Sequence, residues 1–348
     1  MSGDSLDRRT LLRLAGASLL VAGCRTTVDD PTVEVPVVSP PPPSPARVEV
    51  SPSPAGLPPA QRYVPLAGER LPQCKQVAAD FMQALATRTR GQQPADVMAA
   101  AAAFTGTGFR PDPAMLIAAP LYTEPLSAGD IVYPQFAGLL PLSPGARRAA
   151  MMVVVRQRSL TGGDTSTQTV RICDVRLEVQ QNLWRVVELV SIGGEPVGRP
   201  PGLDPRAARV LDDPRIELPD TARWDVHAGR ISLDLLDVLA VAAAAAPVAV
   251  TVLRSGHPPN VFATPKISNH TQGRAVDLWR VDGQPVVTTG AAAGSARALL
   301  AAVAADRRLL QAGSPEGSDL DGAGRRSFTD LVHSDHLHLA VGGPSAPA

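Results

Sequence analysis

The chain has 348 residues and carries 33 basic and 33 acidic side chains, so its formal net charge at pH 7 is zero. The sequence contains no basic patch interleaved with aromatic residues, which argues against a nucleic-acid partner. Without the export and linker segments described next, the length is sufficient for about two ordinary domains.

The first 24 residues have the pattern of an export signal. Asp7-Arg-Arg-Thr-Leu-Leu12 opens a short apolar stretch that ends in Leu20-Val-Ala-Gly-Cys24. This pattern is typical of a twin-arginine signal peptide followed by a lipoprotein cleavage site. The stretch is too short to cross about 30 Å of hydrocarbon. We therefore predict removal of the signal, lipidation of Cys24 with palmitate-type chains, and retention at the outer face of a bacterial cytoplasmic membrane. The alternative is an ordinary secretory peptide with a chance cysteine.

Residues 25–65 are rich in proline and lack apolar periodicity, which predicts a disordered linker. Proline-rich chain extends by about 3.1 Å per residue, so this segment could reach roughly 100 Å from its anchor. That reach suits a cell-wall polymer as partner. A spacer without any length requirement is the alternative.

Residues 66–200 are predicted to form a first α+β domain of unknown role. Apolar residues three and four apart predict a helix around Val77 to Leu85, and an alanine-rich helix follows at 95–104. Strand-like runs are 149–157, 168–179 and 184–192, with a hairpin turn at 180–183. Helices on a curved antiparallel sheet resemble the cone fold of the nuclear transport factor 2 superfamily.

This first region also contains the two remaining cysteines, Cys74 and Cys173. An exported protein can oxidise such a pair to a disulfide. Two buried free thiols are the alternative. Neither cysteine fits a zinc motif.

A cluster of glycine, proline and arginine at 193–204 marks a break, and residues 205–343 are predicted to form a second α+β domain. Its expected elements are a helix capped by Ser232 and ended by Pro247, a buried strand 248–253, a hairpin about Asp282-Gly283, a helix 295–311, a loop 312–328 and a final strand with the last histidines. The overall fold class is therefore α+β.

This second region holds the residue types of a three-ligand zinc site. Catalytic zinc requires three protein ligands, which His270, Asp277 and His338 can supply. Gly273 allows a sharp turn between the first two, and Asp277 would lie on a strand. On the final strand, the period of two places His336 and His338 on one face. The alternative is that these are surface histidines on loops.

Two motifs carry a resemblance to a known family. Ser268-Asn-His-Thr-Gln-Gly-Arg-Ala-Val-Asp277, followed by Asp335-His-Leu-His338, resembles the metallopeptidases of the D-Ala-D-Ala carboxypeptidase and L-Ala-D-Glu endopeptidase group, which share their fold with the Hedgehog signalling domain. The resemblance covers residues 213–342. It implies zinc ligation by the three residues named above and a site arginine at Arg254.

The resemblance also implies roles for neighbouring residues. Asp335, three residues before the last ligand, would be the general base for a water molecule activated by zinc. His336 would donate to the developing oxyanion or carry a proton, and His333 corresponds to a further active-site histidine. Arg254 would bind a substrate carboxylate or carbonyl. Ser268 would belong to the substrate-binding site or support its turn.

The sequence thus predicts a membrane-tethered zinc metallopeptidase that hydrolyses peptide stems of peptidoglycan, as a carboxypeptidase or an endopeptidase. One alternative is a catalytically inactive lipoprotein that binds peptidoglycan or a partner and keeps zinc structurally. Another places the main role in the first domain, as a scaffold for other envelope proteins.

Overall fold

The structure, a computed structural model, describes residues 57–109, 121, 126–143, 146–161, 165–287, 291–315 and 326–343. The predicted signal peptide, Cys24 and most of the predicted linker lie outside these residues. Within the described part, no helix has the length and apolar character needed to cross a membrane. All described elements belong to one compact unit, Val50–Ala348. The finer division into domains 66–200 and 205–343 stays a prediction.

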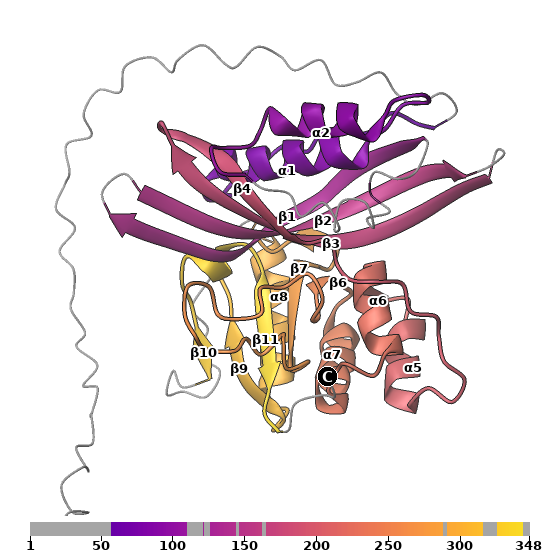
Figure 1. The fold of residues 1–348 in the computed structure, drawn as a ribbon. Helices are drawn as coiled ribbons and strands as arrows, with labels where there is room; N and C mark the ends of the chain where they lie inside the picture. The colour runs from indigo at the N-terminus through magenta and orange to yellow at the C-terminus, as the bar shows by residue number, and fades with distance from the viewer. Residues whose placement is uncertain are drawn as a thin grey trace, which may run out of the picture. The chain divides into compact units, whose positions relative to one another are not determined.

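The first part of this unit is a four-stranded antiparallel sheet with two helices over one face (Figure 1). We call it the first sheet, and its strand order is β1-β2-β3-β4. Its elements are α1 (Pro72–Ala86), α2 (Pro94–Ala102), β1 (Ser127–Ser143), β2 (Ala146–Thr161), β3 (Thr165–Gln180) and β4 (Leu183–Ser191). The predicted helices and three of these strands are confirmed.

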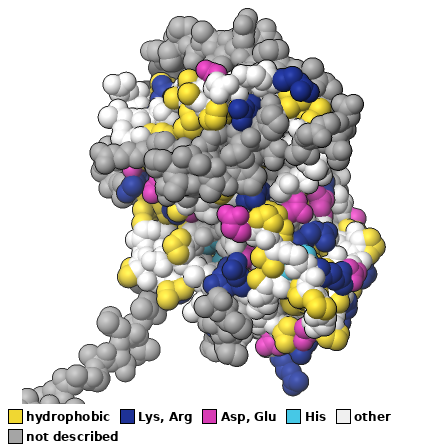
Figure 2. All heavy atoms as spheres, turned by 45° about the vertical axis from the view of Figure 1, so that its right-hand side comes forward, with side chains coloured by type: hydrophobic (Ala, Val, Ile, Leu, Met, Phe, Trp, Pro, Cys, Tyr) yellow, Lys and Arg dark blue, Asp and Glu magenta, His cyan; other side chains and the backbone are white. Residues whose placement is uncertain are grey.

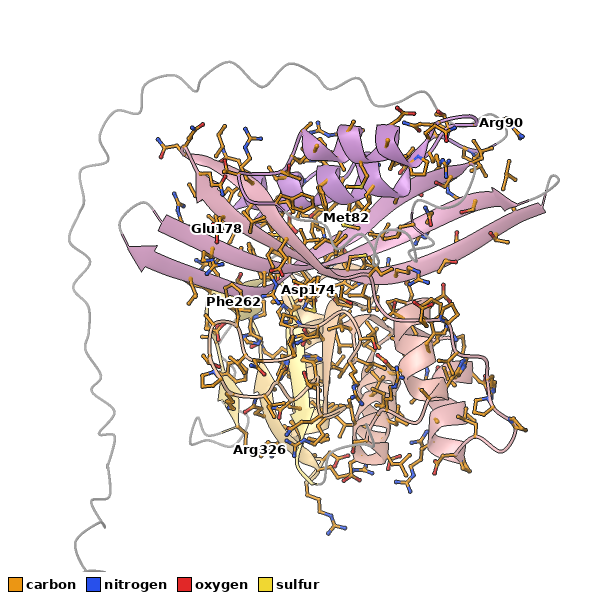
Figure 3. All side chains as sticks on the ribbon, viewed as in Figure 1. Met82, Arg90, Asp174, Glu178, Phe262 and Arg326 are labelled. Atoms are coloured by element: carbon orange, nitrogen blue, oxygen red, sulfur yellow. The ribbon has the colours of Figure 1, made fainter. Side chains whose placement is uncertain are left out.

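Apolar periodicity explains the packing of this part. Phe81, Met82 and Leu85 are buried on one side of α1, and Met82 lies between α1 and the first sheet (Figure 3). The β3–β4 hairpin turns at Gln181 and Asn182, which have φ of 50° and 63°. Two consecutive left-handed residues are the conformation that a two-residue hairpin requires.

Strand β1 was not predicted from the sequence. It contains Gly129, Pro134, Gly138 and Pro141, residues that normally interrupt strands. β1 lies at an edge of the first sheet, and among the described strands it pairs with β2 alone, with three register shifts. An edge strand tolerates proline because one row of its backbone N–H groups needs no partner strand.

The second part is a seven-stranded sheet, which we call the second sheet, with order β10-β9-β11-β7-β6-β5 and β8 paired to β7. Its strands are β5 (Ile216–Glu217), β6 (Val248–Val252), β7 (Ala275–Val281), β8 (Gln284–Pro285), β9 (Leu309–Gly313), β10 (Ser327–Phe328) and β11 (Leu337–Val341). Its helices are α5 (Pro205–Asp212), α6 (Asp220–His227), α7 (Leu233–Ala245) and α8 (Ala291–Ala304), with a 3-10 turn at Val332–Ser334. The predicted α+β class is confirmed.

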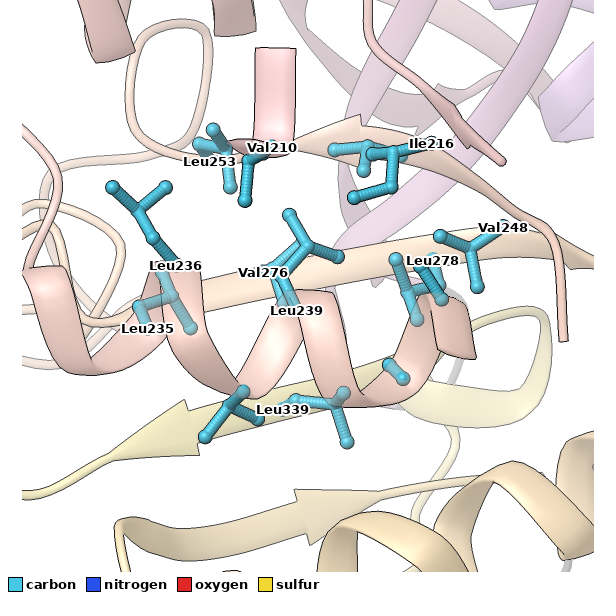
Figure 4. Close-up of a cluster of buried hydrophobic side chains, with 14 of the residues drawn as sticks. Val210, Ile216, Leu235, Leu236, Leu239, Val248, Leu253, Val276, Leu278 and Leu339 are labelled. Carbon is cyan, nitrogen blue, oxygen red and sulfur yellow. The ribbon is translucent and has the colours of Figure 1, made fainter. Parts of the chain in front are cut away.

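A hydrophobic core joins α7 to the second sheet (Figure 4). Leu235 and Leu239 of α7 lie close to Val276, Leu278 and Leu339 of the central strands, and all five are buried. Full burial of each such side chain contributes about 1.5–3 kcal/mol to stability. This core fixes the strands that carry the site residues.

Several local predictions in this part are confirmed and others are wrong. Ser232 is the N-cap residue of α7, although among the described residues its side chain makes no capping hydrogen bond. Asp282 and Gly283, with φ of 51° and 72°, form the predicted hairpin turn. The predicted helix 295–311 is wrong at its end: α8 stops at Ala304, because residues 309–313 form β9 and pair with β11. The predicted loop 312–328 begins inside β9, and residues 316–325 lie outside the described part.

The two sheets contact each other where β1 of the first sheet meets β7 and the connection between β6 and β7. Phe262 of this connection lies at the boundary between them (Figure 3), where a Cβ on Gly138 of β1 would collide with its ring. The guanidinium of Arg176 lies 5.3 Å from the same ring. Tyr133 of β1 stacks on Trp279 of β7 with ring centroids 4.8 Å apart. The strand β1 therefore lies directly against the segment that carries the predicted ligands.

Asp174 of β3 provides a pH-dependent test of this packing. Burial raises the pKa of its carboxyl to about 6, against the opposing effect of Arg176, and within the described residues its Oδ1 has no hydrogen-bond partner. The folded protein therefore holds this proton to higher pH than the unfolded chain, so the free energy of unfolding falls as pH rises from 4 to 6. Relative to Asp174→Asn, we expect the wild type to lose about 2 kcal/mol over this range. Urea unfolding of both proteins at several pH values measures the difference, and parallel curves would contradict the prediction.

A candidate metal centre

Three side chains from separate segments bring one donor atom each to a single point. His270 Nε2 lies 3.2 Å from Asp277 Oδ1 and 3.3 Å from His338 Nδ1. His338 Nδ1 lies 2.8 Å from Asp277 Oδ1. Ligands at about 2.0–2.1 Å from a tetrahedral zinc are about 3.3 Å from one another. The three predicted ligands thus have the mutual spacing of one face of such a site.

The register of the second sheet creates this arrangement. Asp277 of β7 and His338 of β11 are direct partners across the antiparallel pair. Directly opposed residues point to the same face with their Cβ atoms close together. The predicted strand positions of Asp277 and His338 are confirmed, whereas His336 lies just before β11.

A tight turn delivers the third ligand. Gly273 has a φ of +68°, and its N–H donates to the carbonyl of His270 at 2.8 Å. The predicted turn at Gly273 is confirmed. Ser268 Oγ accepts from the N–H of His270 at 3.2 Å, so Ser268 supports the turn.

Hydrogen bonds of His270 and Asp277 leave one atom of each directed at the shared point. His270 Nδ1 donates to the carbonyl of Leu253 at 2.8 Å, which leaves Nε2 as the unprotonated nitrogen. Asp277 Oδ2 accepts from the side-chain amide of Gln135 at 2.8 Å, which leaves Oδ1. Such outer contacts fix the orientation and tautomer of metal ligands.

His257 is a further member of the cluster. Its ring stacks on that of His270 with centroids 4.1 Å apart, and the ligand atoms of His257, His270 and Asp277 all lie within 4.8 Å of one another. This largely buried group could hold a metal ion. The shorter distances to His338 favour His338 over His257 as the third ligand.

The electrostatics keep these groups in the protonation states that metal ligands need. Burial would raise the pKa of Asp277, but the surrounding histidines hold it well below its usual value. Burial lowers the pKa of His338 to about 4, against the effect of Asp277. Asp277 is therefore a carboxylate and His338 a neutral imidazole at neutral pH.

Asp335 and His336 form a buried pair beside the three donors. His336 Nδ1 lies 2.8 Å from Asp335 Oδ1, and His336 Nε2 lies 3.6 Å from Asp277 Oδ2. Asp335 Oδ2 is bonded to Lys75 Nζ at 2.6 Å and accepts from the N–H of Phe136 at 3.2 Å. Both carboxylate oxygens of Asp335, the predicted general base, are thus bonded to other groups. The nitrogen that faces the candidate metal ligands is Nε2 of the neighbouring His336.

The other predicted site residues lie at the edge of this cluster. The ring of His333 is 5.0 Å from that of His336, and its Nδ1 bonds to Asp330 at 2.8 Å. Arg254 follows β6 as predicted, and its N–H donates to the buried Asp225 at 3.2 Å. The structure therefore brings His333 to the cluster and anchors the backbone of Arg254 through α6.

The two cysteines of the described chain take no part in the cluster. Cys74 and Cys173 are buried free thiols and do not form a disulfide with each other, which was the other possibility that the sequence left open. Burial raises the pKa of Cys173 to about 12. Both thiols therefore remain protonated and act as small apolar groups.

Two residues of the site were missed by the sequence reasoning, Gln135 and Lys75. Gln135 lies on the unpredicted strand β1, where nothing local distinguishes it. Lys75 did carry a signal: it is one of only two lysines in the chain and lies within an apolar helical pattern, where a solvated cation is unexpected.

The cluster lies mostly beneath the surface. His270, Asp277 and His336 are at most 2 % exposed, and His338 is 7 % exposed. On the face drawn in Figure 2, histidine contributes only small areas. A separate cavity of about 470 Å³, lined in part by Arg62, Arg156 and Trp279, contains none of the cluster residues.

Comparison with known proteins gives no further identification: no family model, no curated protein and no solved structure matches the chain.

Metal content of purified variants tests the ligand assignment. We expect about one zinc per chain in the wild type, and loss of zinc in His270→Ala and His338→Ala because each removes a donor. His257→Ala should retain zinc. Elemental analysis after dialysis against a weak chelator measures the ratio. Loss of zinc in His257→Ala with retention in His338→Ala would exchange the two assignments.

Proposed function

We propose that this protein is a zinc-dependent peptidase acting on the peptide stems of peptidoglycan. The observation that carries the proposal is the mutual spacing of 2.8–3.3 Å among His270 Nε2, Asp277 Oδ1 and His338 Nδ1. A polarised acid–base pair, Asp335 and His336, lies directly beside these atoms. The combination supports hydrolysis better than metal binding alone.

His270, Asp277 and His338 would hold the zinc. Zinc at such a site supplies a Lewis acid that polarises a carbonyl and brings the pKa of water toward neutrality. The chain's own contribution is proton transfer at His336 Nε2, while Asp335 accepts a hydrogen bond from Nδ1–H and fixes the ring. Burial lowers the pKa of His336, but Asp277 and Asp335 outweigh it and the net pKa is raised. His333 and Arg254 would contact the substrate.

The substrate class and location follow from the family resemblance and the export signal. Lipidated Cys24 would anchor the chain at the outer face of the cytoplasmic membrane, because two or more acyl chains bind firmly where one is marginal. The proline-rich linker would then allow the enzyme to reach the wall polymer.

A non-catalytic role is the second candidate, and the position of His257 favours it. If His257 joined the other three donors, four protein ligands would close the site, as in structural zinc centres. The two candidates differ in one measurement: incubation of zinc-loaded protein with purified muropeptides. Released D-alanine or cleaved stems support the peptidase, and intact stems support the structural role.

The acid–base assignment makes its own prediction. His336→Ala should keep the zinc and lower kcat by about 10²–10⁴-fold, because the proton carrier is lost. Asp335→Asn should also keep the zinc and lower kcat to a smaller extent, since the imidazole remains. His227→Ala, at a histidine on α6 bonded to the carbonyl of Val197, serves as control. A larger loss in Asp335→Asn than in His336→Ala would return the role of base to Asp335.

A further inference from the structure

We infer that α1 and β1 of the first sheet complete the metal centre, and that Gln135 and Lys75 are its positioning residues. Gln135 acts on the ligand Asp277, and Lys75 acts on the pair Asp335 and His336. The Lys75 part rests on the proposed function. The Gln135 part requires only that a metal binds.

Gln135 is a fully buried side chain held from both ends. Its amide nitrogen donates to Asp277 Oδ2 at 2.8 Å, and its amide oxygen accepts a hydrogen bond from Thr251 of β6. The hydroxyl of Thr251 therefore fixes which way the amide faces. This hydrogen bond to Oδ2 holds the carboxylate with Oδ1 toward His270 Nε2 and His338 Nδ1, at 3.2 and 2.8 Å.

Lys75 reaches the site from α1. Its ammonium lies 2.6 Å from Asp335 Oδ2 and 2.9 Å from Glu69 Oε1, and all three side chains are 0 % exposed. Glu69 is bonded independently by the hydroxyl of Tyr63 at 2.7 Å and the N–H of Leu66 at 3.0 Å. Glu69 thus holds the cation in place, and the cation in turn holds Asp335.

The edge of β1 contributes two more contacts to Asp335. The N–H of Phe136 donates to its Oδ2 at 3.2 Å, and the hydroxyl of Tyr133 donates to its backbone carbonyl at 3.2 Å. Because the other oxygen of Asp335 bonds His336 Nδ1, every one of these contacts limits the rotation of the imidazole. The carboxylate of Asp335 thus connects the first sheet to His336: contacts from α1 and β1 fix the carboxylate, and the carboxylate fixes the imidazole ring.

This arrangement gives the first region a role that its own sequence does not show. The region need not have a separate substrate, because its α1 and β1 supply groups that the second sheet lacks. The prediction of a scaffold for other envelope proteins is then unnecessary to explain why these residues are present.

Zinc affinity tests Gln135. In the full chain, Gln135→Met keeps the volume and removes the donor to Asp277, so we expect zinc affinity to fall 10–100-fold. Competition with a chromophoric chelator measures it, with circular dichroism to verify folding. Lys266→Met, at the only other lysine and fully outside the cluster, should keep wild-type affinity. Unchanged affinity in Gln135→Met would overturn this part.

Kinetics and histidine NMR test Lys75. Lys75→Met should lower kcat at least tenfold with KM and zinc content unchanged, and should shift the ring ¹⁵N resonances of His336 but not those of His227. In the Asp335→Asn background, the same change should cost less than threefold, because the carboxylate through which Lys75 acts is gone. Equal losses in both backgrounds, or unmoved His336 resonances, would overturn it.

Further variants distinguish a failure of the Lys75 inference from a failure of the proposed peptidase function. If Lys75→Met does not fold because the buried carboxylates of Glu69 and Asp335 are left unpaired, Lys75→Met combined with Asp335→Asn and Glu69→Gln removes all three charges. The kcat of this variant is compared with that of Asp335→Asn combined with Glu69→Gln. Equal kcat values support the role of Lys75 through Asp335, and a lower kcat in the variant that lacks Lys75 contradicts it. If wild-type protein cleaves no stems, the proposed function fails, while the zinc affinity of Gln135→Met and the His336 resonances still decide the inference.

Discussion

The antiparallel register between β7 and β11 is the constraint on which the site depends. Because Asp277 faces His338 directly, a shift of one residue would turn one of them to the opposite face of the sheet and separate the donors. The hydrophobic core beneath the sheet prevents this shift, since Leu278 and Leu339 on the same strands would leave the core with it. The packing of α7 therefore specifies the arrangement of the candidate ligands as well as the fold.

The first sheet adds the second layer of the same site. Trp279 stacks on Tyr133 and the Phe262 ring lies against Gly138, so β1 is held where Gln135 meets Asp277. Metal ligands commonly depend on such outer contacts for orientation. In this chain these contacts come from residues more than a hundred positions earlier in the sequence. They form because the two sheets pack against each other at β1 and β7.

The sequence predicted the parts of the site that have local signals. The turn at Gly273, the strand at Asp277 and the final strand at His338 follow from glycine placement and alternation, and the structure confirms them. β1 could not be predicted, because Pro134 and Gly138 interrupt the pattern and only its edge position makes them acceptable. Residues 309–313 became a strand through pairing with β11, an interaction that no local window contains. The partners of Asp335 were missed for the same reason.

The buried charges give the strongest physical argument for a bound cation. Asp277 is 2 % exposed and lies among the buried rings of His270, His336 and His338. Burial alone would raise its pKa, but these histidines hold the pKa well below its usual value, so the buried carboxyl is ionised. Burial of an uncompensated charge costs several kcal/mol. Lys75 does not relieve it, since Glu69 and Asp335 already share that cation. A divalent ion bound at Asp277 Oδ1 would offset this cost. The carboxylate of Asp335, which bonds His336 Nδ1 at 2.8 Å, would then remain as the group that raises the pKa of His336 against its burial.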